Sequence, residues 1–208
     1  MAMALWRLSR PLPGHLRTHL GRQVLSRIPL ETARAQLLAR MPKGSACAEI
    51  GVWQGDFSRE ILEIVRPATL HLLDPWTFQP QFPERMYGGR IADGQAYMDR
   101  LYGSVLGRFA GHDNVRVHRL FSRDLLRAVG VGSLDWVYID GNHSKDAVRE
   151  DLHLAWQAVR PGGFITGDDY FWIDADGSFT VQAAVDEFAR ERGVEVELVG
   201  GQFVLLRA

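Results

Sequence analysis

The amino-acid sequence predicts an α/β protein with a doubly wound, mostly parallel sheet and one antiparallel strand at its edge. Short apolar segments alternate with amphipathic segments along most of the chain, and this order places helices on both faces of a parallel sheet. The chain then ends in two strand-like segments separated by Gly200-Gly201, and a two-residue link of this kind makes an antiparallel hairpin.

Five strands before the closing pair are expected where short apolar runs are bounded by Gly, Pro or Asp. They are residues 46–50, 69–73, 115–118, 134–139 and 164–166. Helices are expected where apolar residues recur at three- and four-residue spacing and a Pro or Gly ends the run. They are residues 29–40, 56–65, 93–109, 144–159 and 180–192.

Length and composition are those of one globular domain, with 208 residues, 46% apolar and 24% charged. A net charge of -1 gives no reason to expect nucleic-acid binding. The single Cys47 cannot form an intramolecular disulfide, so it is expected to be a buried small hydrophobe in a protein of the cytoplasm. No apolar run approaches ~20 residues, and no transmembrane segment is expected.

The first 43 residues are expected to form a basic arm and a helix, followed by a single domain over residues 44–208. Five arginines precede the first acidic residue, Glu31. A transit peptide or a membrane-surface segment has this composition. The favoured interpretation is an arm that packs on the domain, covers the active site or joins a dimer interface.

The connection between Trp76 and Gly111 is unusually long. Its first half mixes aromatic residues with Pro and Gly, and the helix at 93–109 forms its second half. Loops of this length in a compact domain are often functional. A mobile lid over a substrate and a simple insertion both remain open.

A strand, a glycine turn and a helix start follow one another in the segment A-C-A-E-I-G-V-W-Q-G-D-F-S, residues 46–58. Glycine is favoured where the backbone must approach a bulky ligand or adopt a positive φ. The spacing of Gly51 and Gly55 is not the G-x-G-x-x-G of dinucleotide-binding folds, so a nicotinamide dehydrogenase is disfavoured. An ordinary α/β connection would have the same pattern.

Polar side chains follow the strands where a ligand of an open α/β sheet would bind. Asp74 lies some twenty residues after the glycine turn, where a carboxylate can accept hydrogen bonds from the two hydroxyls of a ribose. A helix cap or a loop carboxylate is the alternative.

Lys145 is a less suitable base than the nearby His143, because an exposed lysine is mostly protonated. An imidazole at His143 can act as a general base near neutral pH, as a cap or as a cofactor contact.

Three carboxylates, Asp140, Asp168 and Asp169, are expected at the ends of two adjacent strands. They would repel one another unless a cation or protons compensate their charge. Oxygen ligands of this kind suit Mg²⁺, which keeps water molecules that a substrate can replace. In the alternative, Asp168 or Asp169 caps a loop and Asp140 contacts only the cofactor.

Several of these motifs together resemble the class I S-adenosylmethionine-dependent methyltransferases. The motifs are E-I-G-V-W-Q-G-D-F-S, L-L-D-P-W, V-Y-I-D-G-N-H-S, the V-R-P-G-G of residues 159–163, and G-D-D-Y. The similarity is greatest to the small bacterial enzymes related to macrocin and other sugar O-methyltransferases, and it covers residues 44–207.

The resemblance implies a Rossmann-like seven-stranded sheet whose last strand is antiparallel, with S-adenosylmethionine as cofactor. It implies the cofactor against Gly51 and Gly55, its ribose on Asp74 and its adenine near Ser122. The full set of residues expected to contact the cofactor is Glu49, Gly51, Gly55, Phe57, Ser58, Asp74, Trp76, Ser122, Asp140 and His143. The resemblance further implies Mg²⁺, or another divalent cation, on Asp140, Asp168 and Asp169. The catalytic residues expected from the sequence are His143 and Asp140, either of which could take the proton of the hydroxyl. Catechol-type relatives carry a lysine base at the position of His143, and some sugar-modifying relatives an acidic residue at the position of Asn142.

The expected function is therefore a Mg²⁺-assisted O-methyltransferase that acts on a hydroxyl of a sugar or another small-molecule acceptor. A metal-independent methyltransferase is the first alternative. A non-catalytic binding module that retains the fold is the second. The acceptor and the oligomeric state stay open, although the N-terminal arm would suit a homodimer.

Overall fold

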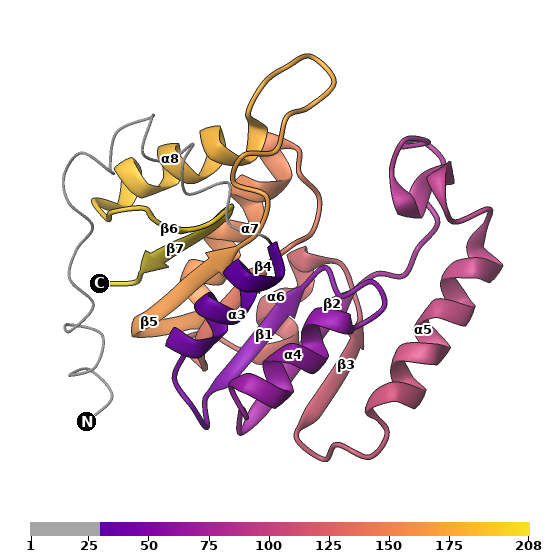
Figure 1. The fold of residues 1–208 in the computed structure, drawn as a ribbon, viewed down its shortest axis with the longest axis horizontal. Coiled ribbons are helices and arrows are strands. Elements are labelled where there is room, and N and C mark those ends of the chain that lie inside the picture. The colour runs from indigo at the N-terminus through magenta and orange to yellow at the C-terminus, as the bar shows by residue number, and fades with distance from the viewer. Residues whose placement is uncertain (1–29) are drawn as a thin grey trace.

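A seven-stranded sheet forms the centre of the protein, of which the structure, a computed structural model, describes residues 30–208 (Figure 1). The strand order is β3-β2-β1-β4-β5-β7-β6. The strands are β1 (Ala46–Ile50), β2 (Thr69–Asp74), β3 (Val115–Arg119), β4 (Leu134–Ile139), β5 (Val159–Gly167), β6 (Glu197–Val199) and β7 (Gln202–Leu206). Among the strands of the described residues, β7 runs antiparallel to both of its neighbours, β5 and β6. The predicted mostly parallel sheet with an antiparallel hairpin at its edge is confirmed, and β6 is the outermost strand.

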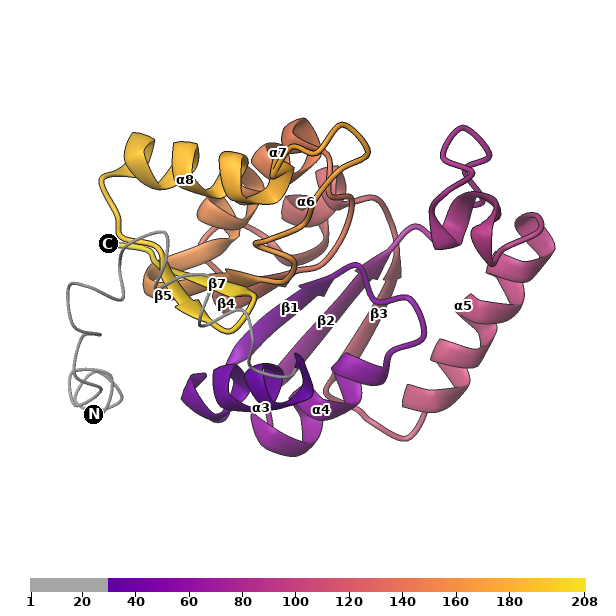
Figure 2. The ribbon, with the colours of Figure 1, turned by 45° about the horizontal axis from the view of Figure 1, so that its top comes forward.

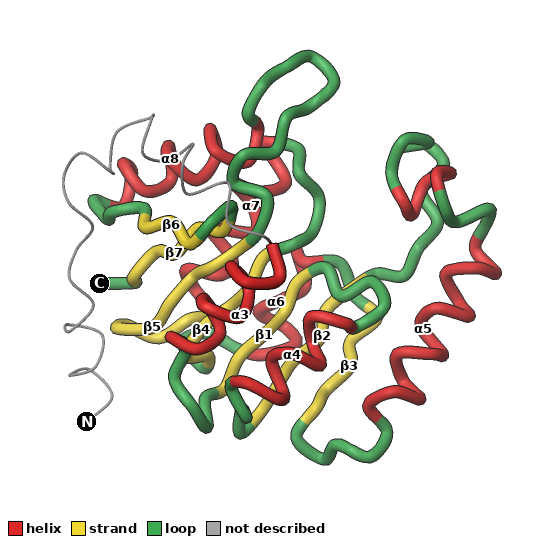
Figure 3. The backbone as a smooth tube through the Cα atoms, viewed as in Figure 1, coloured by secondary structure: helices red, strands yellow, loops and turns green. Residues whose placement is uncertain are grey.

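Helices cover both faces of the sheet (Figure 2). One face carries α3 (Leu30–Arg40), α4 (Asp56–Ile64) and α5 (Gln95–Phe109), and the opposite face carries α6 (Leu125–Val129), α7 (Lys145–Ala158) and α8 (Thr180–Arg192). Two short helical turns lie in the connections, η2 (Met86–Arg90) and η3 (Ser122–Asp124) (Figure 3). No described helix is long and apolar enough to cross a membrane.

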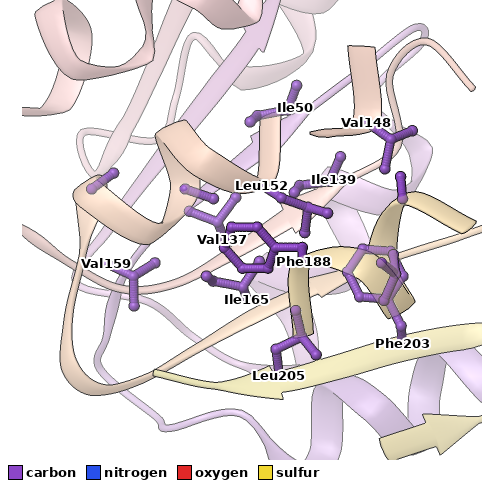
Figure 4. Close-up of a cluster of buried hydrophobic side chains, with 14 of the residues drawn as sticks. Ile50, Val137, Ile139, Val148, Leu152, Val159, Ile165, Phe188, Phe203 and Leu205 are labelled. Atoms are coloured by element: carbon purple, nitrogen blue, oxygen red, sulfur yellow. The ribbon is translucent and has the colours of Figure 1, made fainter. Parts of the chain in front are cut away.

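The two faces of the sheet are buried in two separate hydrophobic clusters. Along β4, Val137 and Ile139 belong to the cluster under α7 and α8, where Leu152 and Phe188 pack on them (Figure 4). Trp136 and Tyr138 alternate with them and belong to the cluster under α3, α4 and α5. Each of these side chains contributes ~1.5–3 kcal/mol through removal of its apolar surface from water. This burial on both faces explains why the central strands are almost continuously apolar.

The structure differs from the predicted elements mainly at β5. This strand begins at Val159, directly after α7, and contains the Pro161-Gly162-Gly163 segment that was expected to separate helix from strand. The pairing with β4 starts at Leu134 and Val159 and shifts register before Trp136, and such an irregularity accommodates Pro and Gly within a strand. The short α6 and η3 were not predicted, because five and three residues are too few to show a helical period.

The predicted N-terminal arm lies outside the described residues, but the helix that follows it is described. Leu37 and Leu38 of α3 are fully buried and join the cluster on that face of the sheet. The helix therefore packs tightly on the rest of the domain.

Candidate functional site

A cavity of about 710 Å³ lies beyond the carboxyl ends of β1, β2 and β4. Its lining includes half of the residues that the sequence singles out, namely Gly51, Asp74, Ser122, Asp140, His143 and Asp169. The other half are buried and are not part of the lining: Glu49, Gly55, Phe57, Ser58, Trp76 and Asp168. The predicted residues thus form a wall of the cavity and a layer behind that wall.

The glycine turn after β1 is forced by close packing against the loop after β4. Gly51 has a φ of +88°, and a Cβ at this position would lie 1.9 Å from the Asp140 carbonyl oxygen. Hydrogen bonds from Gly51 N to Leu73 O (2.9 Å) and from Asp140 N to Ile50 O (2.8 Å) hold the turn between β2 and β4. Glycine is required here by the protein's own backbone, whether or not a ligand approaches the turn.

Asp74 holds the glycine turn in place from the end of β2. Its Oδ2 accepts hydrogen bonds from the backbone N–H groups of Val52 (3.1 Å) and Trp53 (3.0 Å), and its Oδ1 accepts one from Trp76 N (2.8 Å). Burial raises the pKa of the Asp74 carboxyl, and the three backbone donors oppose this shift. A carboxylate has about four acceptor positions, so Asp74 retains capacity for a ligand hydroxyl. Trp76 is fully buried and supports the turn from behind, because its Nε1 donates to Trp53 O (2.9 Å).

Glu49, Ser58 and Phe57 fasten the start of α4 to the sheet. The Ser58 hydroxyl donates to Oε2 of Glu49, and the Phe57 ring packs 4.2 Å from the ring of Tyr138 on β4. Burial raises the pKa of Glu49 to about 8, although the Ser58 hydrogen bond opposes the shift. In this structure these three residues position the turn that lines the cavity and do not themselves reach the cavity.

Asp140, His143 and Asp169 form a compact cluster in the cavity wall. One ligand atom of each residue lies within 4.8 Å of the others. Nε2 of His143 is 3.2 Å from Oδ2 of Asp169 and 3.7 Å from Oδ1 of Asp140. This nitrogen is buried and makes no hydrogen bond of acceptable geometry within the described part of the chain. A buried polar atom in this situation indicates a position for a proton, a cation or a substrate atom.

The backbone around this cluster is well fixed. Ser144 caps α7, with Oγ accepting a hydrogen bond from Ala147 N, and Asn142 Oδ1 accepts one from Ser144 N (2.8 Å). Asp169 adopts a left-handed conformation with a φ of +55°, which turns its carboxylate away from the strand direction of β5. Burial, together with the neighbouring Asp168, raises the pKa of Asp169 to about 6, while His143 opposes the shift.

Asp168 is separated from this cluster by an arginine that the sequence did not single out. Arg34 on α3 donates from Nη2 (2.6 Å) and Nε (3.1 Å) to Oδ2 of Asp168, and from Nη2 to Oδ2 of Asp140 (3.2 Å). Oδ1 of Asp168 accepts the N–H of Asp169 (2.9 Å). The three carboxylates predicted as one metal site are therefore divided. Two of them face His143, and Asp168 faces Arg34.

The alternation of side chains along the strands is the sequence signal that would have indicated a partner such as Arg34. Side chains alternate along β1, β4 and β5, so Glu49, Asp140 and Asp168 fall on the same face as Cys47, Tyr138 and Phe164. That face is covered by α3 and α4. Acidic residues gathered on one buried face need protons or a nearby cation to compensate their charge.

Asp151 is a second residue of the cavity that the sequence did not single out. It is 2% exposed, lies on the buried side of α7 and lines the cavity beside Ser122. Burial raises the pKa of Asp151 to about 7, and a hydrogen bond with Ser122 lowers it. The sequence signal that would have identified Asp151 is a carboxylate among the apolar residues on one side of a predicted helix.

Two loops form the outer wall of the cavity. One is the first half of the long connection after β2, and the other follows β5. They meet where the guanidinium carbon of Arg85 lies 4.8 Å from the centre of the Trp172 ring and Nη2 of Arg85 lies 3.7 Å from Oδ1 of Asp174. The Trp172 ring also packs against His143, with ring centroids 4.5 Å apart. The outer wall is thus connected directly to the cluster.

The donor set of the cluster fits a divalent cation. Two carboxylate oxygens and an imidazole nitrogen, already close together, are ligands that Mn²⁺, Zn²⁺ and related ions accept, and the carboxylates also suit Mg²⁺. The unbonded Nε2 of His143 supports this fit. The residues that would hold the ion are Asp140, His143 and Asp169, with Asp168 bound to Arg34 instead.

Comparison with known proteins identifies a family and several solved structures of similar fold. A family model described as a methyltransferase domain matches residues 48–170, from β1 to just after β5. No curated protein sequence matches the chain. The solved structure of the O-methyltransferase NovP superposes with a TM-score of 0.59 at 20% identity, covering 85% of this chain and 80% of that one.

Two further solved structures are similar. A protein from Corynebacterium glutamicum gives a TM-score of 0.58 at 20% identity over 94% of this chain and 88% of that one. Fibrillarin from Aeropyrum pernix, solved with natively bound S-adenosyl-L-methionine, gives a TM-score of 0.57 at 13% identity over 88% of this chain and 76% of that one. At these identities the likeness to solved structures concerns the fold.

Proposed function

The chain belongs to the methyltransferase family whose model matches residues 48–170, and from this premise we propose that it transfers a methyl group from S-adenosylmethionine to a hydroxyl oxygen of a small molecule. The observation that carries the proposal is the shared cavity. A single space of about 710 Å³ joins the Gly51 turn and Asp74 to the cluster of Asp140, His143 and Asp169. A donor and an acceptor must lie in one such space for a direct transfer.

The inner part of the cavity is the proposed cofactor site. The turn at Gly51 brings backbone close to the ligand, Asp74 has acceptor capacity for a ribose hydroxyl, and Ser122 lies on the neighbouring wall for the adenine. Glu49, Phe57 and Ser58 would act on the cofactor through the turn that they position. Residues 44–208 are the proposed catalytic domain, to which α3 contributes Arg34.

The chemical step requires the hydroxyl to lose its proton as its oxygen attacks. The new O–C bond forms while the S–C bond of the sulfonium breaks, S-adenosylhomocysteine leaves, and His143 or Asp140 takes the proton. A divalent cation on the cluster would lower the pKa of the hydroxyl and orient its oxygen. Asp140, Asp169 and His143 are the residues that would hold it, and the acidic wall is the place to which the acceptor hydroxyl would be directed.

A metal-independent reaction is the second candidate, because Arg34 already offsets part of the carboxylate charge. In that case Nε2 of His143 is the base that takes the proton of the hydroxyl. Asp169, 3.2 Å away, would stabilise the resulting imidazolium. The two candidates share the cofactor, the acceptor site and the direction of transfer.

Titration calorimetry with S-adenosylhomocysteine tests the cofactor, in the presence of Mg²⁺ and again after chelation. Micromolar binding in both conditions is expected, since Gly51, Asp74 and Ser122, which are proposed to hold the cofactor, are not ligands of the proposed cation. No binding in either condition would refute the proposed function.

A screen of sugars and phenols for S-adenosylhomocysteine release then tests the reaction. Chelation should abolish turnover if the cation is needed, and turnover that is unchanged by chelation would favour His143 as base. Lys145→Ala is a matched control, because Lys145 neighbours the cluster in sequence but pairs with Glu187 (2.7 Å) away from the cavity. Turnover of this control should match that of the wild type.

A further inference from the structure

Arg34 is held firmly at the acidic edge of the sheet. Its neighbours on α3, Leu37 and Leu38, lie one turn further along the same side of the helix and are fully buried. The guanidinium carbon lies 4.8 Å from the centre of the Phe57 ring, which itself packs on Tyr138. The guanidinium is therefore fixed by the packing of α3 and α4 as well as by its carboxylate partners.

The contacts of Arg34 are with the carboxylates that the sequence assigns to a metal. It donates twice to Oδ2 of Asp168 and once to Oδ2 of Asp140. Asp168 is 5% exposed, and with its Oδ1 on the Asp169 N–H both of its oxygens are engaged. Asp140 is shared, because Oδ2 faces Arg34 while Oδ1 faces His143.

We propose that Arg34 is a resident counter-cation of this site, which keeps Asp168 out of the ligand set and weakens the binding of a divalent cation by Asp140, His143 and Asp169. Arg34 and a divalent cation on the cluster would both contact Asp140. The fixed positive charge of Arg34 therefore repels the divalent cation. The inference rests on one part of the proposed function, namely that Asp140, His143 and Asp169 bind a divalent cation. It goes further by making cation affinity depend on a residue of α3.

A direct consequence concerns Asp168. If the charge of Arg34 is removed, Asp168 loses its partner and becomes available as an additional oxygen ligand. Loss of Arg34 should therefore strengthen cation binding for two reasons, relief of repulsion and gain of a ligand. A merely structural arginine would have the opposite effect, because its loss would loosen the site.

Arg34→Met is the variant that separates these effects. Methionine keeps an unbranched apolar side chain for contact with Phe57 and removes the charge. We expect Arg34→Met to bind Mn²⁺ about tenfold more tightly than the wild type, measured by the EPR signal of free Mn²⁺. Arg34→Lys keeps the charge and should remain close to the wild type. Asp168→Asn should weaken Mn²⁺ binding more in the Arg34→Met background than in the wild type.

The matched control is Arg160→Met. Arg160 forms a similar pair with Asp135, with Nη2 and Oδ1 2.5 Å apart, at the opposite ends of β4 and β5. Its replacement also removes one positive charge from the same two strands and should leave the Mn²⁺ affinity unchanged.

An Mn²⁺ affinity of Arg34→Met equal to or weaker than that of the wild type would overturn the inference, and so would the absence of Mn²⁺ binding in both proteins. Titration of S-adenosylhomocysteine into the same samples reports on folding and on the proposed function separately. Wild type that fails to bind S-adenosylhomocysteine refutes the proposed function, whereas bound S-adenosylhomocysteine with no effect of Arg34→Met refutes the inference alone.

Discussion

Nε2 of His143 lies 3.2 Å from Oδ2 of Asp169, and the two residues follow different strands of the sheet. The contact depends on the left-handed backbone of Asp169, at a φ of +55°, which directs one carboxylate of the Asp168-Asp169 pair toward the loop after β4. The same turn leaves Asp168 on the side of α3, where Arg34 binds it. Two adjacent aspartates thereby acquire different partners and different chemistry.

The first prediction concerns His143. In His143→Ala the cluster loses its only nitrogen donor, which is either the base or a cation ligand. We expect kcat to fall by about 10²-fold or more, with S-adenosylhomocysteine affinity changed by less than about threefold. Steady-state rates with an acceptor from the screen, together with calorimetric titration, measure the two quantities. Loss of cofactor affinity in parallel with kcat would instead assign His143 to the cofactor site.

The second prediction concerns the pH dependence of stability, through Glu49. This carboxyl is 2% exposed, and burial raises its pKa from an ordinary 4.5 to about 8. Between these two values the unfolded chain releases the proton while the folded protein keeps it. The stability contributed by the neutral carboxyl is therefore present below pH 4.5 and is lost as pH rises toward 8.

Glu49→Gln removes this titration. The variant should be more stable than the wild type by roughly 3 to 5 kcal/mol at pH 8, with a difference that shrinks toward pH 4.5. Urea unfolding across this pH range measures the difference. Glu63→Gln, on the exposed side of α4, is the control. Parallel pH profiles for Glu49→Gln and the wild type would contradict the prediction.

The third prediction concerns the turn after β1. Gly51→Ala places a Cβ 1.9 Å from the Asp140 carbonyl oxygen at a φ of +88°. The variant should lose about 3 kcal/mol or more of folding free energy, because the backbone of β4 would have to move. Gly103→Ala is the matched control. Gly103 lies inside α5 with nothing within 4 Å of its Cβ position, and alanine there should stabilise by about 0.5–1 kcal/mol. Equal thermal unfolding of the two variants would argue against the close approach.

The fourth prediction concerns the outer wall. Arg85→Ala removes the contacts with Trp172 and Asp174 that join the two loops over the cavity. We expect the KM for the acceptor to rise by about five- to tenfold while the affinity for S-adenosylhomocysteine stays constant, because Arg85 contacts the Trp172 ring that packs on His143 of the cluster. This outcome would favour the lid over the simple insertion as the role of the long connection.

A double-mutant cycle with Trp172→Ala tests whether Arg85 acts through that ring. The two substitutions should be less than additive in their effect on KM if the residues act as one contact. Full additivity would mean that Arg85 affects KM independently of Trp172.

The sequence was sufficient for most of the fold. Apolar runs of strand length, amphipathic segments with Pro or Gly stops, and the Gly200-Gly201 hairpin each depend on local chemistry, and β1, β2, β4 and α8 follow their predicted ranges within one residue. The extent of β5 was not predictable, since whether a Pro-Gly-Gly segment ends a strand depends on the neighbouring strand to which it can pair.

The sequence by itself determined that Asp74, Asp140, His143 and Asp169 would gather at one edge, because parallel strands end on the same side of a sheet. Only the tertiary structure decided how these groups are paired. Arg34 carries no motif, and its contact with Asp168 joins residues 134 positions apart through the docking of α3 on the sheet. The direction of a side chain and the identity of its partner depend on packing between elements, which is not encoded in any single local segment.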